Sequence, residues 1–275
     1  MPEGDTIFRA ARTLNQALGG KVVTRFETAL AQLARVDVDA PLKGRTVTSV
    51  TARGKHMLMA FSGDLVLRTH MRMNGSWHIY RPAERWQRSR SAMRMVVETA
   101  DFVAVGFDVP VADFFTGRAL EREDSLRLLG PDLLRDDFDA TEAARRLRER
   151  GGSEVGDALL NQRVLAGIGN VFKSEVCFAC GVSPFTLVHT VSDAQIQALL
   201  QTAKKYLRAN VADGAGDEIL TYTGMRRTTG RSDPSERLWV YGRSGQPCRK
   251  CGARILFKKQ GIDARVTYWC PKCQP

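Results

Sequence analysis

The chain ends in the stretch CRKCGARILFKKQGIDARVTYWCPKC, residues 248–273, in which two Cys-x2-Cys pairs flank a strand-like run. Each pair holds two thiolates on one turn, and two such pairs complete a tetrahedral zinc site with no position left for water. We therefore expect Cys248, Cys251, Cys270 and Cys273 to bind one structural zinc ion per chain. The metal would stabilise a ribbon too small to fold by apolar burial alone. Four incidental buried thiols are the alternative.

A third Cys-x2-Cys, formed by Cys177 and Cys180, lies inside the apolar run Val176-Cys-Phe-Ala-Cys-Gly-Val. A second pair is lacking nearby, and a free cysteine in apolar surroundings behaves as a small hydrophobic residue. We expect both side chains to belong to a helical core.

The rest of the chain predicts an α+β protein. Apolar residues recur at helical spacing from Ile7 to Leu18, and short β-type runs such as His56-Met-Leu-Met-Ala-Phe and Leu65-Val-Leu-Arg-Thr-His follow as far as about Val109. These patterns favour an N-terminal helix with an antiparallel β-sandwich, and a barrel is the alternative. Beyond Gly151-Gly152 the chain reads as mostly helical, with a turn at Gly167-Ile-Gly169 and helices over 170–180 and about 192–210.

We expect four parts in chain order. They are a β-sandwich domain over 1–130, a linker and helix over 131–154, a helical domain over 155–223, and a loop with the zinc ribbon over 224–275. Within the last two parts, the polar and poorly periodic segment Thr221–Arg237 is predicted to be a mobile surface loop.

The charge balance favours a nucleic acid as partner. The formal net charge is +11 and the sequence pI is near 9.7, and a basic protein gains affinity by releasing counterions from phosphates. No apolar run approaches the length of a membrane span, and no secretory signal follows Met1. We expect a monomer in the reducing cytosol, associated with the nucleoid in a bacterium, and no membrane partner.

Four segments resemble the formamidopyrimidine-DNA glycosylase and endonuclease VIII family, in the family's order. They are the start Met1-Pro-Glu-Gly-Asp5, the run Arg53-Gly-Lys-His-Met57, the run Gln162-Arg-Val-Leu-Ala-Gly-Ile-Gly-Asn-Val171 and the cysteine ribbon. The resemblance implies a helix-two-turn-helix in the helical domain. It also implies a bifunctional enzyme of base excision repair that removes an oxidised base and cleaves the exposed strand.

The family's catalytic residues carry over to Pro2, Glu3, Lys55 and Arg265. Once Met1 is removed, the amine of Pro2 would attack the sugar, and an α-amino group is far less protonated at neutral pH than a lysine. Glu3 would act as general acid, Lys55 would hold a phosphate from a strand, and Arg265 would reach the phosphate beside the lesion. Rigidity at Pro2 and surface charges at Glu3 and Lys55 are the structural alternatives.

The resemblance also implies DNA-binding roles for His70, Arg72, Met73 and Asn170. Met73, with Arg72 beside it, would fill the gap left by an everted base, unless Met71 and Met73 are simply the core and surface residues of a strand. Asn170 would offer its amide and nearby N–H groups to a phosphate, or else serve only as an N-cap.

The start Pro2-Glu3-Gly4 is similar to the endonuclease VIII branch and predicts oxidised pyrimidines as substrates. The stretch Met225–Gly230 agrees, since it lacks the lesion-capping loop of the other branch. Asp5 and Thr6 depart from the family, which often has proline and a second glutamate there. Two alternatives stay open: a glycosylase for oxidised purines, and a non-enzymatic zinc-ribbon DNA-binding protein.

Overall fold

The computed structural model describes residues 2–212 and 237–275, which form two compact units, 2–127 and 128–212 with 237–275. The expected surface loop lies largely in 213–236, and the comparison of Met225–Gly230 with the other branch lies wholly there, outside the described residues. None of the described helices is both long and apolar enough to cross a membrane.

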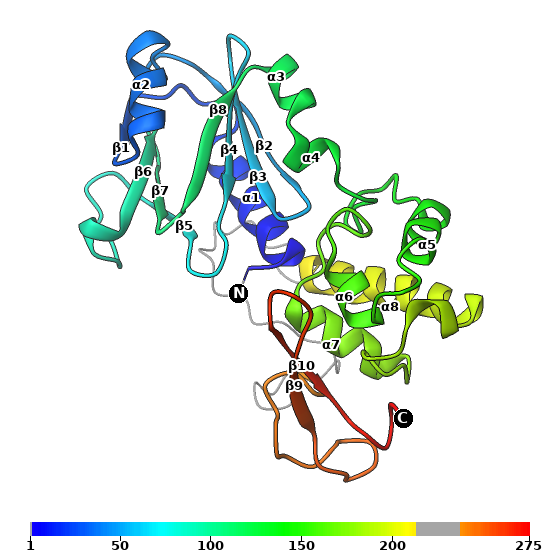
Figure 1. The fold of residues 1–275 in the computed structure, drawn as a ribbon. Coiled ribbons are helices and arrows are strands. Elements are labelled where there is room, and N and C mark those ends of the chain that lie inside the picture. Colours follow the sequence, from blue (N-terminus) through cyan, green and yellow to red (C-terminus); the bar gives the residue numbers. More distant parts are fainter. Residues whose placement is uncertain (1, 213–236) are drawn as a thin grey trace. The chain divides into compact units, whose positions relative to one another are not determined.

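The first unit is an antiparallel β-sandwich with a helix at its start, as predicted (Figure 1). One sheet has the order β1 (Arg25–Thr28), β6 (Met93–Glu98), β7 (Val103–Phe107) and β5 (Ser76–Tyr80); the other has the order β2 (Val47–Arg53), β3 (His56–Phe61), β4 (Leu65–His70) and β8 (Val111–Phe115). The helices are α1 (Gly4–Leu18), α2 (Ala31–Asp39), α3 (Gly117–Arg122) and α4 (Asp124–Arg127), with a 3-10 turn at Arg90–Ala92.

Alternation along the strands builds the core of this unit. In β3 the buried residues Met57, Met59 and Phe61 share one face, as residues two apart in a strand must. They join Trp77 of the other sheet and Leu14 of α1 in one apolar cluster. The α1 helix packs against β2 and β3 and contributes Leu14 to this core.

The second unit contains the helices and the ribbon hairpin, both of which the sequence predicts (Figure 1). Its elements are α5 (Ala140–Arg148), α6 (Val155–Leu160), α7 (Asn170–Ala179), a 3-10 turn (Val188–Thr190), α8 (Asp193–Ala212), and the antiparallel strands β9 (Leu256–Gln260) and β10 (Arg265–Trp269). Leu147 of α5, Phe172 of α7 and Leu200 of α8 are fully buried in the helical core. The helix expected in the 131–154 linker is thus packed into this unit.

Cys177 is fully buried in the same helical core, and Cys180 packs against it, as expected for small core residues. Burial raises the pKa of the Cys177 thiol to about 12, which keeps it protonated and unreactive.

Candidate functional sites

The chain start belongs to the first unit, and its residues from Pro2 to Ile7 are buried. Pro2 is buried, and the side chain of Glu3 has no exposed surface. Glu3 is the residue before α1, and its carbonyl accepts the N–H of Ile7 at 3.0 Å. The alternative reading of Glu3 as a surface charge is therefore wrong. A carboxylate buried beside the first helical turn is placed where the helix dipole stabilises negative charge.

Asp5 and Thr6, the two departures from the family pattern, are buried in the first turn of α1. Arg9 lies one turn further along, with its Nη2 3.7 Å from the Asp5 carboxylate. The start of α1 thus holds two buried carboxylates, those of Glu3 and Asp5, close together in sequence. The burial of Asp5 was not expected from the sequence.

Lys55 lies in the turn between β2 and β3 and not on a strand, so that part of the expectation is wrong. Arg53 pairs with His56 across the hairpin, which leaves Gly54 and Lys55 as a two-residue loop. Gly54 has φ of 58°, and such a loop favours glycine at its first position because the left-handed region is open to it. The turn places the half-buried Lys55 at the end of the sheet.

His70 ends β4 beside this turn, and its ring lies edge-on to that of His56 with 4.8 Å between centroids. The backbone N–H of Arg72 donates to His70 Nδ1 at 3.1 Å, which leaves the proton on Nε2. Burial first, and then the charge of Lys55, lower the pKa of His70 to about 4. His70 is therefore a neutral imidazole at physiological pH, and it can donate an N–H.

The loop after β4 exposes Met73, the residue expected to fill the gap left by an everted base. Met71 is buried in the core, whereas the side chain of Met73 is 56% exposed. Arg72 adopts a positive φ of 46°, and the N–H of Gly75 closes the loop on the Met71 carbonyl at 2.9 Å. The strand alternative fails for Met73, since β4 ends at His70 and residues 72–74 form a turn.

In the second unit, the turn before α7 is braced by Gln162. Its side-chain amide donates to the carbonyls of Leu160 and Ile168, and its oxygen accepts the N–H of Gly167 at 3.1 Å. Gly167 has φ of 103°, a conformation that favours glycine. The braced turn leads directly into the N-terminus of α7.

Asn170 is the first residue of α7, and Gly169 is the N-cap, so the N-cap alternative for Asn170 is wrong. The Asn170 Nδ2 donates to the Val266 carbonyl of β10 at 2.7 Å. Its Oδ1 is buried and has no hydrogen-bond partner among residues 2–212 and 237–275. This bond joins the start of α7 to the ribbon strand that begins with Arg265.

Arg265 pairs with Gln260 at the turn end of the β9–β10 hairpin, next to the connecting residues 261–264. Its side chain is 43% exposed, and Asp263 is 3.8 Å from its guanidinium. The structure therefore brings Asn170 close to Arg265, because Asn170 is hydrogen-bonded to Val266, the residue after Arg265.

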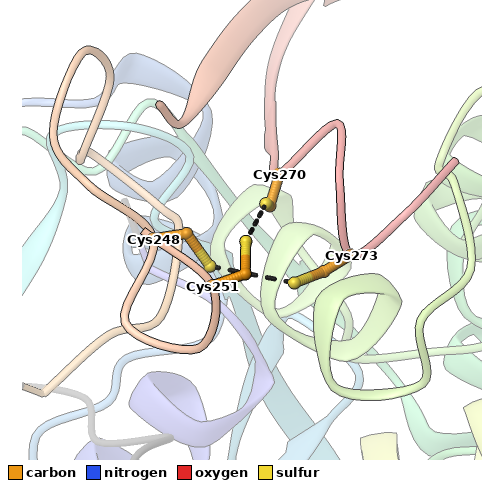
Figure 2. Close-up of side chains that lie close together, drawn as sticks. All are labelled: Cys248, Cys251, Cys270 and Cys273. Carbon is orange, nitrogen blue, oxygen red and sulfur yellow. Dashed lines mark hydrogen bonds between the residues drawn. The ribbon is translucent and has the colours of Figure 1, made fainter. Parts of the chain in front are cut away.

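The four ribbon cysteines point toward one another from two loops (Figure 2). Their sulfur atoms all lie within 4.8 Å of one another, and no disulfide links the described cysteines; Cys251 and Cys270 are 3.5 Å apart and Cys248 and Cys273 are 3.9 Å apart. A tetrahedron of zinc–sulfur bonds of about 2.3 Å has edges of about 3.8 Å. The donor set thus fits zinc, as the spacing predicts.

Two buried charged residues of α7 were missed at the sequence level, although both interrupt an apolar helical run. Glu175 is fully buried and accepts the backbone N–H groups of Trp239, Val240 and Tyr241 at 2.8 to 2.9 Å. Lys173 is also fully buried. Lys and Glu are almost never fully buried unless they are paired, so charged residues within the apolar run Asn170–Cys177 are the sequence signal that would have singled out Lys173 and Glu175.

Three family models match the chain. The formamidopyrimidine-DNA glycosylase N-terminal domain matches residues 1–108, the formamidopyrimidine-DNA glycosylase H2TH domain matches residues 129–220, and the zinc finger found in FPG and IleRS matches residues 245–275. The three matches cover the β-sandwich, the helical domain and the ribbon in that order.

Proteins related over the full chain carry consistent names. The chain is 43% identical to the probable endonuclease 8 2 of Streptomyces coelicolor, with 100% of this chain and 94% of the relative covered. It is 38% identical to the DNA-(apurinic or apyrimidinic site) lyase Nei2 of Mycolicibacterium smegmatis, covering 100% and 99%. The crystal structure of Lactococcus lactis Fpg with DNA containing an abasic site superposes with a TM-score of 0.84 at 22% identity over both whole chains.

Proposed function

The chain belongs to the formamidopyrimidine-DNA glycosylase and endonuclease VIII family, and from that premise we propose that it is a DNA glycosylase and AP lyase of base excision repair. The observation that carries this proposal is the full-length match to endonuclease 8 proteins and to a protein named as an abasic-site lyase. That match includes the chain start, where Pro2 and Glu3 are buried.

In the proposed reaction, removal of Met1 frees the secondary amine of Pro2. Its lone pair attacks C1′ of the damaged nucleotide, and the base departs with the bonding electrons and a proton. The amine then loses its proton and the C1′–O4′ bond breaks, with a proton taken up by the ring oxygen, so that the sugar opens and an iminium joins Pro2 to C1′. This iminium acidifies the C2′ hydrogen, and loss of that proton expels the 3′ phosphate and cuts the strand. Glu3 supplies and accepts protons in these steps, because a carboxyl group shielded from water is suited to general acid–base work.

The two units supply DNA contacts of different kinds. In the first unit, Lys55 and the neutral His70 offer a charged and an uncharged donor to phosphate, and Met73 offers an apolar side chain to the space left by an everted base. In the second, Arg265 and the N-terminus of α7 offer donors to a phosphate. The net charge of +11 adds affinity without sequence preference.

Trapping with borohydride tests the central claim. The protein should form a covalent adduct with duplex DNA that carries thymine glycol or an abasic site, because borohydride reduces the iminium on Pro2. Pro2→Gly should lose most of the base release. The absence of an adduct from protein whose mass shows a processed N-terminus would leave only the non-enzymatic DNA-binding function.

Substrate choice is part of the proposal. The start Pro2-Glu3-Gly4, similar to the endonuclease VIII branch, favours oxidised pyrimidines. Paired rate measurements on thymine glycol and 8-oxoguanine duplexes decide between the two branches, and faster release of 8-oxoguanine would select the purine alternative. We also propose one zinc ion per chain and a cytosolic monomer, which metal analysis and gel filtration of the purified protein check.

A further inference from the structure

Lys173 places a positive charge inside the second unit. Its side chain has no exposed surface, and residues 170–178 of α7, in which it lies, are all buried. Burying an ammonium group is costly unless it is hydrogen-bonded and compensated. Its Nζ donates to the Oγ1 of Thr267 at 2.5 Å, and Thr267 is a fully buried residue of β10.

The hydrogen bonds continue from Thr267 across the ribbon to the start of α6. The Thr267 hydroxyl donates to Gln260 Oε1 at 2.7 Å, and the Gln260 amide donates to the Glu154 carboxylate at 2.7 Å and to the Pro184 carbonyl at 2.8 Å. The hydrogen bonds all run in one direction, from the ammonium group of Lys173 to the carboxylate of Glu154. We call Lys173, Thr267, Gln260 and Glu154 the ribbon latch.

Close backbone approach supports the ribbon latch. A Cβ at Gly156 would collide with the Gln260 side chain, and one at Gly261 would collide with the Asp157 carboxylate. Burial, together with the charge of Glu154, raises the pKa of Asp157, while the charge of Lys173 opposes that rise. Lys173 therefore stabilises the ionised form of Asp157, whose carboxylate lies against Gly261 at the turn end of β9.

We propose that Lys173 is a positioning residue that fixes the β9–β10 hairpin, and with it Arg265, for DNA binding. Thr267 and Arg265 are two residues apart on one strand and so point to the same face, and Gln260 pairs directly with Arg265. The bond from Asn170 to the Val266 carbonyl is a second link between α7 and this strand. The DNA-binding part of this inference rests on the proposed function, and the structural part does not.

A measurement on the free protein tests the structural part. Lys173→Met keeps the length and apolar stem of the side chain and removes its charge and donors. We expect amide hydrogen exchange in residues 256–269 to accelerate at least tenfold, while the bound zinc and the protection of α8 stay unchanged. Thr267→Val breaks the same chain without removing a charge, and it should show the same pattern. Unchanged exchange in both variants would overturn the proposal.

A double-mutant cycle tests whether Lys173 acts through Arg265. Lys173→Met should weaken binding to abasic-site DNA about tenfold, and Arg265→Ala should weaken it at least as much. The double variant should bind no more weakly than Arg265→Ala alone. Additive losses would mean that Lys173 does not work through Arg265 and would reject the inference.

Lys205→Met is the matched control, since it removes the same charge from an exposed position on α8 of the same unit. It should change neither hairpin exchange nor the outcome of the cycle. Borohydride trapping of the wild-type protein runs in parallel. If trapping fails while the hairpin loosens in Lys173→Met, the proposed function is wrong and the ribbon latch stands; if trapping succeeds and the hairpin is unchanged, the reverse holds.

Discussion

His56 and His70 sit where positive charge is already concentrated. Burial is the largest cause for both rings. Together with the charges of His70, Arg68 and Arg53 it lowers the pKa of His56 to about 3, and together with the charges of nearby basic residues it lowers the pKa of His70 to about 4. The Nδ1 of His56 is buried and has no hydrogen-bond partner in the described part of the chain. Both rings are therefore held neutral beside Lys55, which avoids adding charge to a site already rich in cations.

The pH dependence of stability follows from these two rings. Between about pH 6.5 and pH 4 the unfolded chain binds protons at histidine that the folded chain does not, so the free energy of unfolding should fall as the pH is lowered through this window. Urea titrations at several pH values measure this slope. His56→Gln with His70→Gln should flatten it, whereas His189→Gln, at an exposed histidine of the other unit, should not. An equally steep slope in the double variant would contradict the assignment.

At the scale of elements, the loop after β4 depends on Gly75. A Cβ at this position would lie 2.6 Å from the Met71 carbonyl oxygen and 2.9 Å from the Met71 Cα, both backbone atoms. The loop that exposes Arg72 and Met73 cannot close in this form around a larger residue. Its shape is thus set by one glycine and one backbone hydrogen bond.

Gly75→Ala should therefore lower lesion excision from duplex DNA tenfold or more, because Met73 is displaced. Excision rates on a thymine glycol duplex measure this loss. Gly152→Ala is the control, since a Cβ there meets no atom within 4 Å. Circular dichroism should show both variants folded, and a Gly75→Ala enzyme of normal rate would remove the loop from the mechanism.

Elements whose signal is local were predictable from sequence, and contacts between them were not. Alternation located β3 and β4 at His56–Phe61 and Leu65–His70, because one face of each strand is buried. The position of Lys55 was wrong because the end of the hairpin is set by the pairing of Arg53 with His56. The burial of Lys173 depends on Thr267, far along the chain, and no local pattern contains that pairing.

For the whole molecule, the ribbon is the part least able to fold by itself. Its apolar cluster holds only Val240, Ile255, Cys248 and Cys270 with Phe178 of α7 as buried members. So few buried side chains cannot offset the entropy of ordering the segment, and the metal has to contribute the difference.

Cys270→Ser should lose the zinc and unfold the ribbon, while the β-sandwich stays folded. Metal analysis, the emission of Trp239 and Trp269, and DNA affinity follow this change, and the affinity should fall at least tenfold. Cys177→Ser is the control at a buried cysteine outside the metal site, and it should keep its zinc. Full DNA affinity in a zinc-free Cys270→Ser protein would show that the ribbon does not contribute to binding.

The carboxylate of Glu175 has a consequence for how this architecture tolerates change. It accepts hydrogen bonds from the backbone N–H groups of Trp239, Val240 and Tyr241, so α7 itself anchors the entry point of the ribbon. Insertions or deletions ahead of Trp239 would then be absorbed before the anchor. The ribbon can stay bound to α7 in relatives whose chain before Trp239 differs in length.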